Sequence, residues 1–382
     1  MSIDLAAAEE LFATSTDATV GLEEEFAILD AASLDLVPRF EELRDLAIAD
    51  DPVLAEAIAG ELISSEIEIR SGRGEDVHDA LRRQRDARNR LFALAESRGV
   101  ALGATGTHPW ADYREQRNID TEHYRRVVDG LQYVARRNNT FSLHVHVGVR
   151  GADRAVQVCD RLRPVLPLLL AISANSPFVD GLDSGLHTAR TQTFTKSFPR
   201  CGVPDAFGDW RGFKEYLDFL VKTSSIVEYT QVWWSIRPHL SFGTVEVRIC
   251  DAQSTAAESE ALAGLIVGAV LQAARDVDDG VPWVDPAPRL VEENMWRAIR
   301  YGLDGKLIDL DRGEERPAAE AVERLLAWTA PVRGELGIDV AVPECNGAQR
   351  QRRLLESGAS IAEVYAATVR ETRETYAQEA IV

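Results

Sequence analysis

Four short segments of this chain carry cation-binding and phosphate-binding residue types at every second position. They span residues 20–28, 63–70, 142–149 and 244–251, and aliphatic residues fill most of the alternate positions. Side chains at i and i+2 of a β-strand point to the same face. Each segment is therefore predicted to be a strand with one apolar face and one reactive face. The residues on the reactive faces are Glu23 and Glu25, then Glu66, Glu68 and Arg70, then His144 and His146, and last Glu246 and Arg248.

These residue types suit the binding of divalent cations and a triphosphate. Carboxylates are hard oxygen ligands of the kind that Mg²⁺ prefers, and an imidazole nitrogen is better suited to Mn²⁺. The guanidinium of Arg248 offers a planar pair of donors to a phosphate. Four such strands side by side would form a sheet whose open face binds metal ions and phosphate groups.

Each segment also has a simpler interpretation. The triplet Glu23-Glu24-Glu25 is typical of a solvated surface, a His-x-His strand is common in cores, and Glu-x-Arg often forms a plain salt bridge. The recurrence of this chemistry in four segments favours a shared site. Glu24 falls on the apolar face of its segment, so we expect it at a strand edge or bulge.

The composition limits the classes of function. The 382 residues include 62 acidic and 42 basic residues, which give a net charge of −20 and argue against a nucleic-acid or membrane-surface partner. The four cysteines are far apart in the sequence, which favours a cytoplasmic location. The first residues do not resemble a signal peptide, and the apolar run at 261–274 is predicted to be a buried helix.

The remaining pattern predicts one α+β domain over 1–382. Helices are expected at 75–98 and 152–174, with a row of arginines between 82 and 90 on a solvated face of the first, and most of 253–380 is expected to be helical with breaks at 278–290 and 337–347. The two-faced strands favour a mainly antiparallel sheet with one open face. A loop-rich segment at 175–212 is expected to cover the substrate, with 186–204 as a mobile lid that exposes its phenylalanines.

Familiar nucleotide-binding motifs are missing from the sequence. No Gly-x-x-x-x-Gly-Lys-Ser/Thr loop occurs, and no Gly-x-Gly-x-x-Gly opens a predicted helix. A P-loop site is therefore excluded, and a dinucleotide-binding fold has no support.

A set of motifs resembles the carboxylate–amine ligase branch of the glutamate–cysteine ligases. The resemblance covers about residues 17–355, and its specificity comes from the order and spacing of the motifs. They are Gly21-Leu-Glu-Glu-Glu-Phe26, Glu68-Ile-Arg70, Gly106-Thr-His-Pro109, Leu143-His-Val-His-Val-Gly148, Trp234-Ser-Ile-Arg-Pro-His239, Thr244-Val-Glu-Val-Arg248 with Asp251, and Trp296-Arg-Ala298 with Gly302. The resemblance implies a glutamine-synthetase-like fold, in which a curved antiparallel sheet binds ATP and Mg²⁺ on its concave face with helices behind. It also implies a homodimer.

The resemblance assigns roles to individual residues. It implies metal ligands at Glu23, Glu25, Glu68, His144 and Glu246, and more weakly at Glu61. It implies catalytic roles for Arg248, near the transferred phosphate, and for Glu246. Arg190 and Arg237 are expected to hold a substrate carboxylate, and His146 is expected to contact substrate or nucleotide. Glu66 has no assigned role.

The implied reaction is the ATP-dependent joining of a carboxylate to an amine through an acyl phosphate, with ADP and phosphate as products. The expected small-molecule substrates are ATP, glutamate or a similar acid, and cysteine or another amine. Three alternatives remain open from the sequence: a guanidino-kinase-type phosphotransferase, a ligase for another acid and amine, and a non-catalytic metal-binding or ligand-binding protein.

Overall fold

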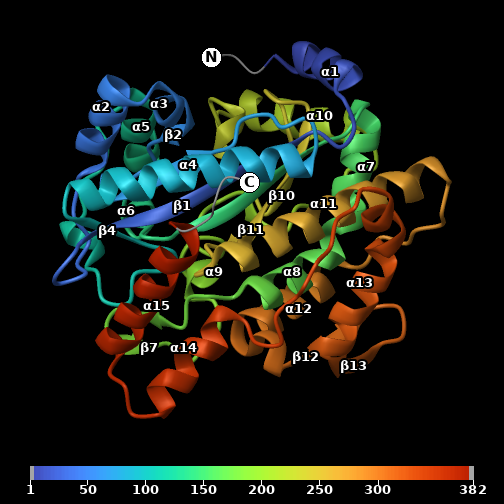
Figure 1. Ribbon diagram of the computed structural model, residues 1–382. Helices are drawn as coiled ribbons and strands as arrows, with labels where there is room; N and C mark the ends of the chain where they lie inside the picture. The colour runs from blue at the N-terminus through green and yellow to red at the C-terminus, as the bar shows by residue number, and fades with distance from the viewer. Residues whose placement is uncertain (1–3, 378–382) are drawn as a thin grey trace.

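The centre of the protein is a seven-stranded antiparallel sheet, which confirms the predicted fold class. The computed structural model describes residues 4–377, so both ends of the predicted domain 1–382 lie outside the described residues. The strand order is β10-β11-β5-β1-β3-β2, and β4 also pairs with β1 (Figure 1). These strands are β1 (Val20–Asp30), β2 (Ile58–Ala59), β3 (Glu66–Arg70), β4 (Val100–Gly103), β5 (Ser142–Gly148), β10 (Ile236–His239) and β11 (Thr244–Asp251).

Smaller pairs of strands and many helices surround this sheet. The small pairs are β6 (Phe178–Val179) with β7 (Leu182–Asp183), β8 (Cys201–Gly202) with β9 (Trp233–Trp234), and β12 (Lys306–Asp309) with β13 (Glu314–Pro317). The α-helices are α1 (Leu5–Thr14), α2 (Phe40–Asp50), α3 (Pro52–Ala57), α4 (Val77–Ser97), α5 (Glu122–Leu131), α6 (Tyr133–Arg136), α7 (Ala152–Leu162), α8 (Leu166–Ser173), α9 (Ala189–Thr193), α10 (Trp210–Lys222), α11 (Ala256–Asp278), α12 (Pro288–Tyr301), α13 (Ala318–Glu335), α14 (Gly347–Glu356) and α15 (Ile361–Tyr376). Short 3-10 turns are η1 (Tyr113–Glu115), η2 (Arg163–Val165), η3 (Tyr229–Gln231) and η4 (Gly302–Asp304).

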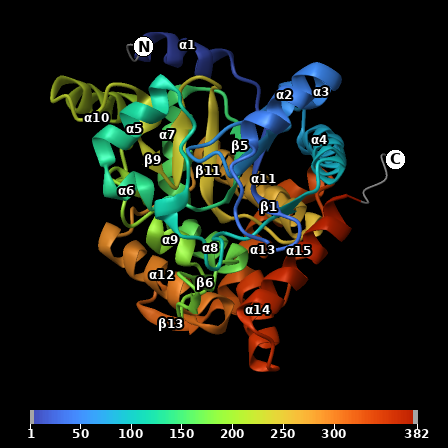
Figure 2. The ribbon, with the colours of Figure 1, turned by 90° about the vertical axis from the view of Figure 1, so that its left-hand side faces the viewer.

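Helices cover one face of the sheet and leave the other to the site. Figure 1 shows α4 and α11 lying across the sheet, and α7 and α8 pack on its β10–β11 side. Val145 and Val247 of the sheet join Ile266 and Val270 of α11 in one buried cluster, which burial of apolar surface stabilises. In the side view of Figure 2, α5 and α6 lie on one side of strands β1, β5 and β11, and α2 and α4 lie on the other side.

The apolar run at 261–274 lies in α11, as predicted. This helix is long and apolar enough to cross a membrane by length and composition alone, but 78% of its apolar window is buried within the fold. The helix is therefore a core element of this structure.

The strand register brings the reactive residues onto one face. Glu23 of β1 lies opposite His144 on one side and Arg70 on the other. Glu25 lies opposite Glu68, and Glu246 lies opposite His146. Directly opposed residues of an antiparallel pair share a face. The predicted alternation is therefore confirmed in all four strands.

A β-bulge in β11 resets this alternation after Arg248. Val247 pairs with Val145 and Cys250 pairs with Leu143, so the two residues between them on β11 oppose His144 alone. The extra residue turns Cys250 toward the buried apolar cluster and places Asp251 opposite Ser142.

The prediction that Glu24 lies at a strand edge or bulge is wrong. Glu24 is in the middle of β1, paired with Ile69 and Leu143, and its side chain is buried on the helix side of the sheet. There it accepts hydrogen bonds from Arg88 and Gln84 of α4. The arginine row of α4 is accordingly not all solvated, because Arg88 is 0% exposed.

Other departures from the predicted elements are local. The helix expected over 152–174 is divided into α7, η2 and α8 where Pro164 and Pro167 occur. The region beyond 253 is helical with the predicted breaks, but residues 306–317 form the β12–β13 hairpin instead of a helix. The predicted helical residues 378–380 lie outside the described residues.

Candidate active site

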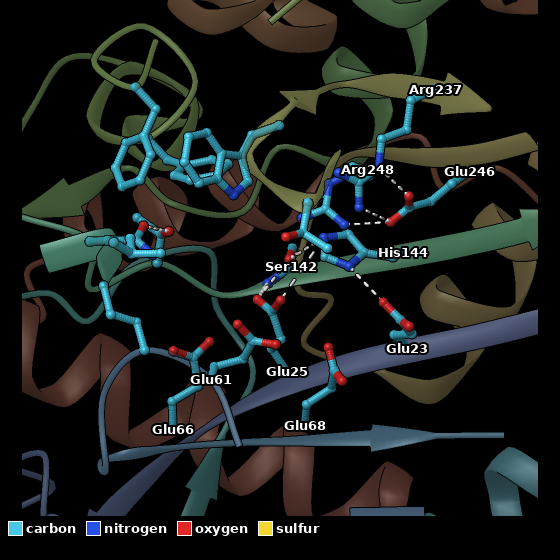
Figure 3. Close-up of a pocket in the computed structure, with 18 of the residues that line it drawn as sticks. Glu23, Glu25, Glu61, Glu66, Glu68, Ser142, His144, Arg237, Glu246 and Arg248 are labelled. Atoms are coloured by element: carbon cyan, nitrogen blue, oxygen red, sulfur yellow. Dashed lines mark hydrogen bonds and ion pairs between the residues drawn. The ribbon is translucent and has the colours of Figure 1, made fainter. Parts of the chain in front are cut away.

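Seven acidic and histidine side chains converge on the open face of the sheet. Figure 3 labels all of them except His146. They form three overlapping groups, and within each group the potential ligand atoms lie within 4.8 Å of one another. The groups are Glu23 with Glu68 and His144, Glu23 with His146 and Glu246, and Glu25 with Glu61 and Glu68. All five residues expected to be metal ligands belong to these groups. The weaker candidate Glu61 belongs to the third group, and His146 lies beside Glu23 and Glu246 in the second.

This acidic cluster lines a cavity of about 380 Å³. The floor is the sheet, and the walls come from α5, α9 and the segment that leads into β9. Arg190, Arg237 and Arg248 also line the cavity. The structure therefore brings all the sequence-predicted site residues to one cavity or, for His146, to its border.

Glu246 is paired with two arginines. Nε of Arg237 lies 2.5 Å from Oε2 of Glu246, and Arg248 donates to Oε1 of the same carboxylate. Burial alone would raise the pKa of Glu246, but the charges of Arg237 and Arg248 hold it well below its usual range. Glu246 is therefore ionised and fixes both guanidinium groups. Arg237, which was expected to hold a substrate carboxylate, is itself held by a protein carboxylate.

The carboxyl pKa values of Glu61, Glu66 and Glu68 are raised, in contrast to the lowered pKa of Glu246. Burial raises the pKa of Glu61 to about 8, and the nearby charge of Glu25 adds to this effect. Burial and neighbouring carboxylates also raise the pKa of Glu66 and of Glu68 well above the ordinary value. Crowded carboxylates of this kind are stabilised by protons or by metal cations.

The two histidines of β5 have different surroundings. Nδ1 of His144 lies 3.0 Å from Glu23, and its Nε2 lies 2.8 Å from Oγ of Ser142. Nε2 of His146 is buried and has no hydrogen-bond partner within residues 4–377, although Glu23 Oε1 is 3.4 Å away and Glu246 Oε1 is 3.7 Å away. A nitrogen left without a partner between two carboxylates fits a divalent cation.

Arg190 does not extend freely into the cavity. It is 3% exposed, and its Nη1 and Nη2 donate to the backbone carbonyls of Ile249 and Arg248, at 3.0 and 3.3 Å. Its Nε has no partner among the described residues. The side chain thus packs against the bulge of β11, with its Nε left for a ligand.

Three residues of the segment predicted as a lid line the cavity. Phe194 and Phe198 line it together with Arg190, and Phe198 stacks edge-on against Trp233. The expectation that these phenylalanines are exposed is wrong, since Phe198 is buried and Phe194 is half-buried, because both pack against neighbouring aromatic rings. Mobility of 186–204 stays a prediction.

A second, mostly apolar cavity of about 430 Å³ lies beside the first. Glu23 and Arg70 line both cavities. The apolar part of the second cavity is formed by Leu11 of α1, by the start of β1 and by Phe242, whose ring stacks on His239 at 4.3 Å. Sequence reasoning missed this cavity, because it forms only where α1 and the β10–β11 turn meet β1. Tyr124, His123 and Trp233 line the first cavity but were not predicted from the sequence, because they are not part of the alternating strand pattern.

Comparisons with known proteins agree with this geometry. Residues 19–379 match the family described as glutamate–cysteine ligase family 2. A protein named "Putative glutamate--cysteine ligase 2-1" from Rubrobacter xylanophilus is 37% identical over 368 residues, which cover 94% of this chain and 96% of the relative. A "Putative glutamate--cysteine ligase 2" from Gloeobacter violaceus is 37% identical over 362 residues, with 93% and 97% covered.

Solved structures show the same fold at much lower identity. The crystal structure of a glutamate–cysteine ligase from Francisella tularensis in complex with AMP has a TM-score of 0.67 at 11% identity, and covers 96% of this chain and 91% of that one. A bifunctional glutathione synthetase from Pasteurella multocida also has a TM-score of 0.67, at 14% identity, with 97% of this chain and 54% of that one covered. The chain therefore belongs to glutamate–cysteine ligase family 2 and is a carbon–nitrogen bond-forming enzyme of the glutamate–cysteine ligase type.

Proposed function

We propose that this enzyme joins the γ-carboxylate of glutamate, or of a close analogue, to an amine at the expense of ATP, with cysteine among the amines it accepts. The observation that carries the proposal is the convergence of Glu23, Glu68, His144 and Glu246 with Arg248 on one sheet face. This combination of carboxylates, imidazole and guanidinium suits a metal-bound triphosphate. Family membership favours a ligase over a guanidino kinase or a non-catalytic binding protein.

The chain offers a place for each part of ATP. The apolar cavity beside Val20 and Phe242 suits the base and ribose, and Glu23 lies between that cavity and the acidic cluster. The adenine nucleotide in the Francisella tularensis relative adds support for ATP use. Arg248, whose Nε has no hydrogen-bond partner within residues 4–377, would contact the transferring phosphoryl group through that donor and its charge.

The acidic residues fit divalent cations, as the unpartnered Nε2 of His146 and the raised pKa of Glu61 indicate. Glu23, Glu25, Glu61, Glu68, His144, His146 and Glu246 would hold them. Mg²⁺, or Mn²⁺ in its place, would neutralise the charge of the triphosphate. The protein supplies the fixed array of ligands and the two oriented arginines.

The reaction proceeds in two steps, phosphoryl transfer to the acid and then amide formation. A γ-carboxylate oxygen attacks the γ-phosphorus of ATP, the bond from that phosphorus to the bridging oxygen breaks, and ADP leaves. The amine nitrogen then attacks the acyl carbon, the bond from carbon to the phosphorylated oxygen breaks, and phosphate leaves. The attacking neutral amine loses one proton to solvent as the amide forms and keeps the other as the amide N–H. Arg248 and Arg237, fixed by Glu246, stabilise negative charge in the first step.

The test is product analysis with Mg²⁺, ATP, glutamate and cysteine, each omitted in turn. We expect ADP and free phosphate in equal amounts together with γ-glutamylcysteine, and only background release when either the acid or the amine is left out. Formation of AMP and pyrophosphate would contradict the acyl-phosphate route. A stable phosphorylated guanidino product would instead indicate the kinase alternative.

A further inference from the structure

Arg70 is the one cationic residue that lines both cavities in the part of the chain that the structure describes. The other residues shared by the two cavities are Glu23, which lies opposite Arg70 on β1, and Ser241 and Phe242 of the β10–β11 turn. A nucleotide with its base in the second cavity and its γ-phosphate at the acidic cluster has to cross this boundary. The residues proposed above for the reaction leave Arg70 without a role.

Most donors of the Arg70 guanidinium are free to bind a ligand. Its Nε donates to Oε1 of Glu68, and Oε1 of Glu23 lies 3.7 Å from the same nitrogen. Neither Nη1 nor Nη2 has a hydrogen-bond partner within residues 4–377, and the side chain is 46% exposed. Four of the five N–H donors of a guanidinium belong to these two nitrogens. The edge of Arg70 formed by Nη1 and Nη2 is therefore unused.

The pairing of Arg70 differs from that of an arginine that only holds a carboxylate. Arg88 binds Glu24 through two nitrogens, Nε and Nη2, at 2.7 Å each. Such two-point pairing is the frequent geometry of arginine with a carboxylate. Arg70 uses only Nε toward Glu68, so this contact orients the guanidinium and leaves its other edge for a second anion.

The backbone that carries Arg70 is fixed beside the start of β1. The N–H of Ser71 donates to the carbonyl of Leu22, and Oγ of Ser71 accepts from the N–H of Leu22. Val20 and Gly74 exchange two further backbone hydrogen bonds. Because this segment is held at both ends, less freedom is lost when the Arg70 side chain orders around a ligand.

The order of residues along β1 matches the order of the parts of ATP. Val20, at the start of the strand, lines only the second cavity. Glu23 lies opposite Arg70, and Glu25 lies opposite Glu68 in the acidic cluster. Three residues of strand separate the first two positions, a distance of roughly 10 Å. With the base and ribose beside the start of β1 and the γ-phosphate at the metal ligands, the β-phosphate falls beside Arg70.

A phosphate at this boundary needs positive charge from the protein. The other charged residue shared by the two cavities is Glu23, which is acidic. Cations bound by the acidic cluster would bridge the β- and γ-phosphates from one side. The Nη1 and Nη2 donors of Arg70 can supply two charge-assisted hydrogen bonds to a β-phosphate oxygen on the other side.

From this arrangement we propose that Arg70 binds the β-phosphate of the nucleotide through Nη1 and Nη2, and that this contact makes the enzyme distinguish ADP and ATP from AMP. This role rests on the proposed ligase function and adds a phosphate-binding residue to its nucleotide site.

Nucleotide binding without acid or amine tests this role apart from the reaction. Titration calorimetry with Mg²⁺ gives the Kd for ADP and for AMP in wild type and in Arg70→Met. The Kd for ADP should rise by at least about tenfold in the variant, through loss of the charge-assisted bonds, and the Kd for AMP should change by less than about twofold. An equal change for both nucleotides, or no change for either, would overturn the proposed contact. So would a wild type that binds AMP as tightly as ADP.

Arg73→Met is the matched control. Arg73 is exposed, has no hydrogen bond or ion pair with other described residues, and lines the second cavity alone. Its replacement should change the Kd values for ADP and AMP by the same factor, so their ratio should stay at the wild-type value. A change in this ratio as large as in Arg70→Met would show that general positive charge near the cavity, and not a contact of Arg70, selects the β-phosphate.

Mn²⁺ binding without nucleotide separates phosphate binding from an indirect effect on the metal site. Arg70 lies beside the carboxylates of Glu23 and Glu68, so the loss of its positive charge should leave Mn²⁺ binding unchanged or make it tighter. Electron paramagnetic resonance of free Mn²⁺ measures this affinity. Weaker Mn²⁺ binding in Arg70→Met would show that Arg70 acts by positioning Glu68, and would overturn the proposed contact.

Arg70→Lys is the second variant, and it decides the question if Arg70→Met does not fold. It keeps a positive charge beside Glu68 but loses the planar pair of donors, so the Kd for ADP should rise by at least about threefold while that for AMP is unchanged. Wild-type affinity for ADP in the Lys variant would overturn the role of Arg70 and leave the ligase function intact. Absence of phosphate release from ATP by the wild type, with acid and amine present, would overturn both.

Discussion

Arg88 of α4 holds Glu24 of β1 by two hydrogen bonds of 2.7 Å through the helix-covered face of the sheet. Glu24 stands between Glu23 and Glu25, which point to the opposite face. The pair thus holds β1 from the helix-covered face at Glu24, whose neighbours Glu23 and Glu25 belong to the acidic cluster on the other face. Arg88 also lies over the ring of Tyr376, with its guanidinium carbon 4.7 Å from the ring centre.

Removal of Arg88 should destabilise the fold strongly. Arg88→Met leaves the buried carboxylate of Glu24 without its charged partner, with Gln84 and Ser259 as remaining donors, and this costs about 3–5 kcal/mol in unfolding free energy. Arg83→Met on the same helix is the control, since Arg83 is half-exposed and its pair with Asp79 contributes about 0.5 kcal/mol. Urea unfolding measures both. A loss below about 1 kcal/mol in Arg88→Met would mean that the pair does not stabilise β1.

Glu246→Gln should nearly abolish ATP turnover and keep the fold. The change removes the charge of a carboxylate proposed as a metal ligand and loosens Arg237 and Arg248 together, so a loss of about 4 kcal/mol in transition-state stabilisation, or roughly a thousandfold in kcat, is expected. Arg248→Lys should also be severe, because a lysine cannot reproduce the planar fork. Phosphate release is measured beside the exposed control Glu314→Gln. Normal turnover in either site variant would remove that residue from the mechanism.

His108 should make the protein sensitive to acid. Its Nδ1 accepts from the backbone N–H groups of Trp110 and Ala111, and its Nε2 lies 2.8 Å from the carbonyl oxygen of Leu34. The folded state therefore holds a neutral ring, and burial lowers the pKa of His108 to about 4. Between about pH 4 and pH 6.5 the unfolded chain binds the extra proton, so the unfolding free energy falls with falling pH by about 1.4 kcal/mol per unit.

The measurement is the pH dependence of unfolding in wild type and in His108→Asn. The variant should lose the contribution of one proton to the slope, whereas the exposed control His78→Asn should match wild type. Burial also lowers the pKa values of His187 and His239, so part of the slope should persist in the variant. Identical slopes in wild type and His108→Asn would show that His108 does not couple to unfolding.

The reactive face of the sheet was predictable from the sequence, but the β-bulge and the buried contacts that hold its residues in place were not. Alternation alone places Glu23 with Glu25 and Glu246 with Arg248, because a strand has a period of two. The bulge after Arg248 depends on pairing with His144, and a single strand carries no sign of it. The partner of Glu24 is likewise 64 residues away on a helix, so the sequence left Glu24 as an anomaly.

The residues that form the walls of the cavities could not be predicted from the sequence either. Tyr124 and Trp233 reach the first cavity from a helix and a short strand that share no periodic pattern with the sheet. Arg190 was predicted as a carboxylate ligand, but the bulge of β11 presents two backbone carbonyls that accept from two of its three nitrogens. Such contacts depend on tertiary packing, which local pattern does not encode.

Oxygen labelling tests most directly whether the acid is activated as an acyl phosphate. Glutamate labelled with ¹⁸O in its γ-carboxylate is incubated with enzyme, ATP, Mg²⁺ and the amine, and the released phosphate is analysed by mass. We expect one labelled oxygen in each phosphate, because the carboxylate oxygen attacks phosphorus and leaves with it. Unlabelled phosphate formed together with the amide would contradict the account.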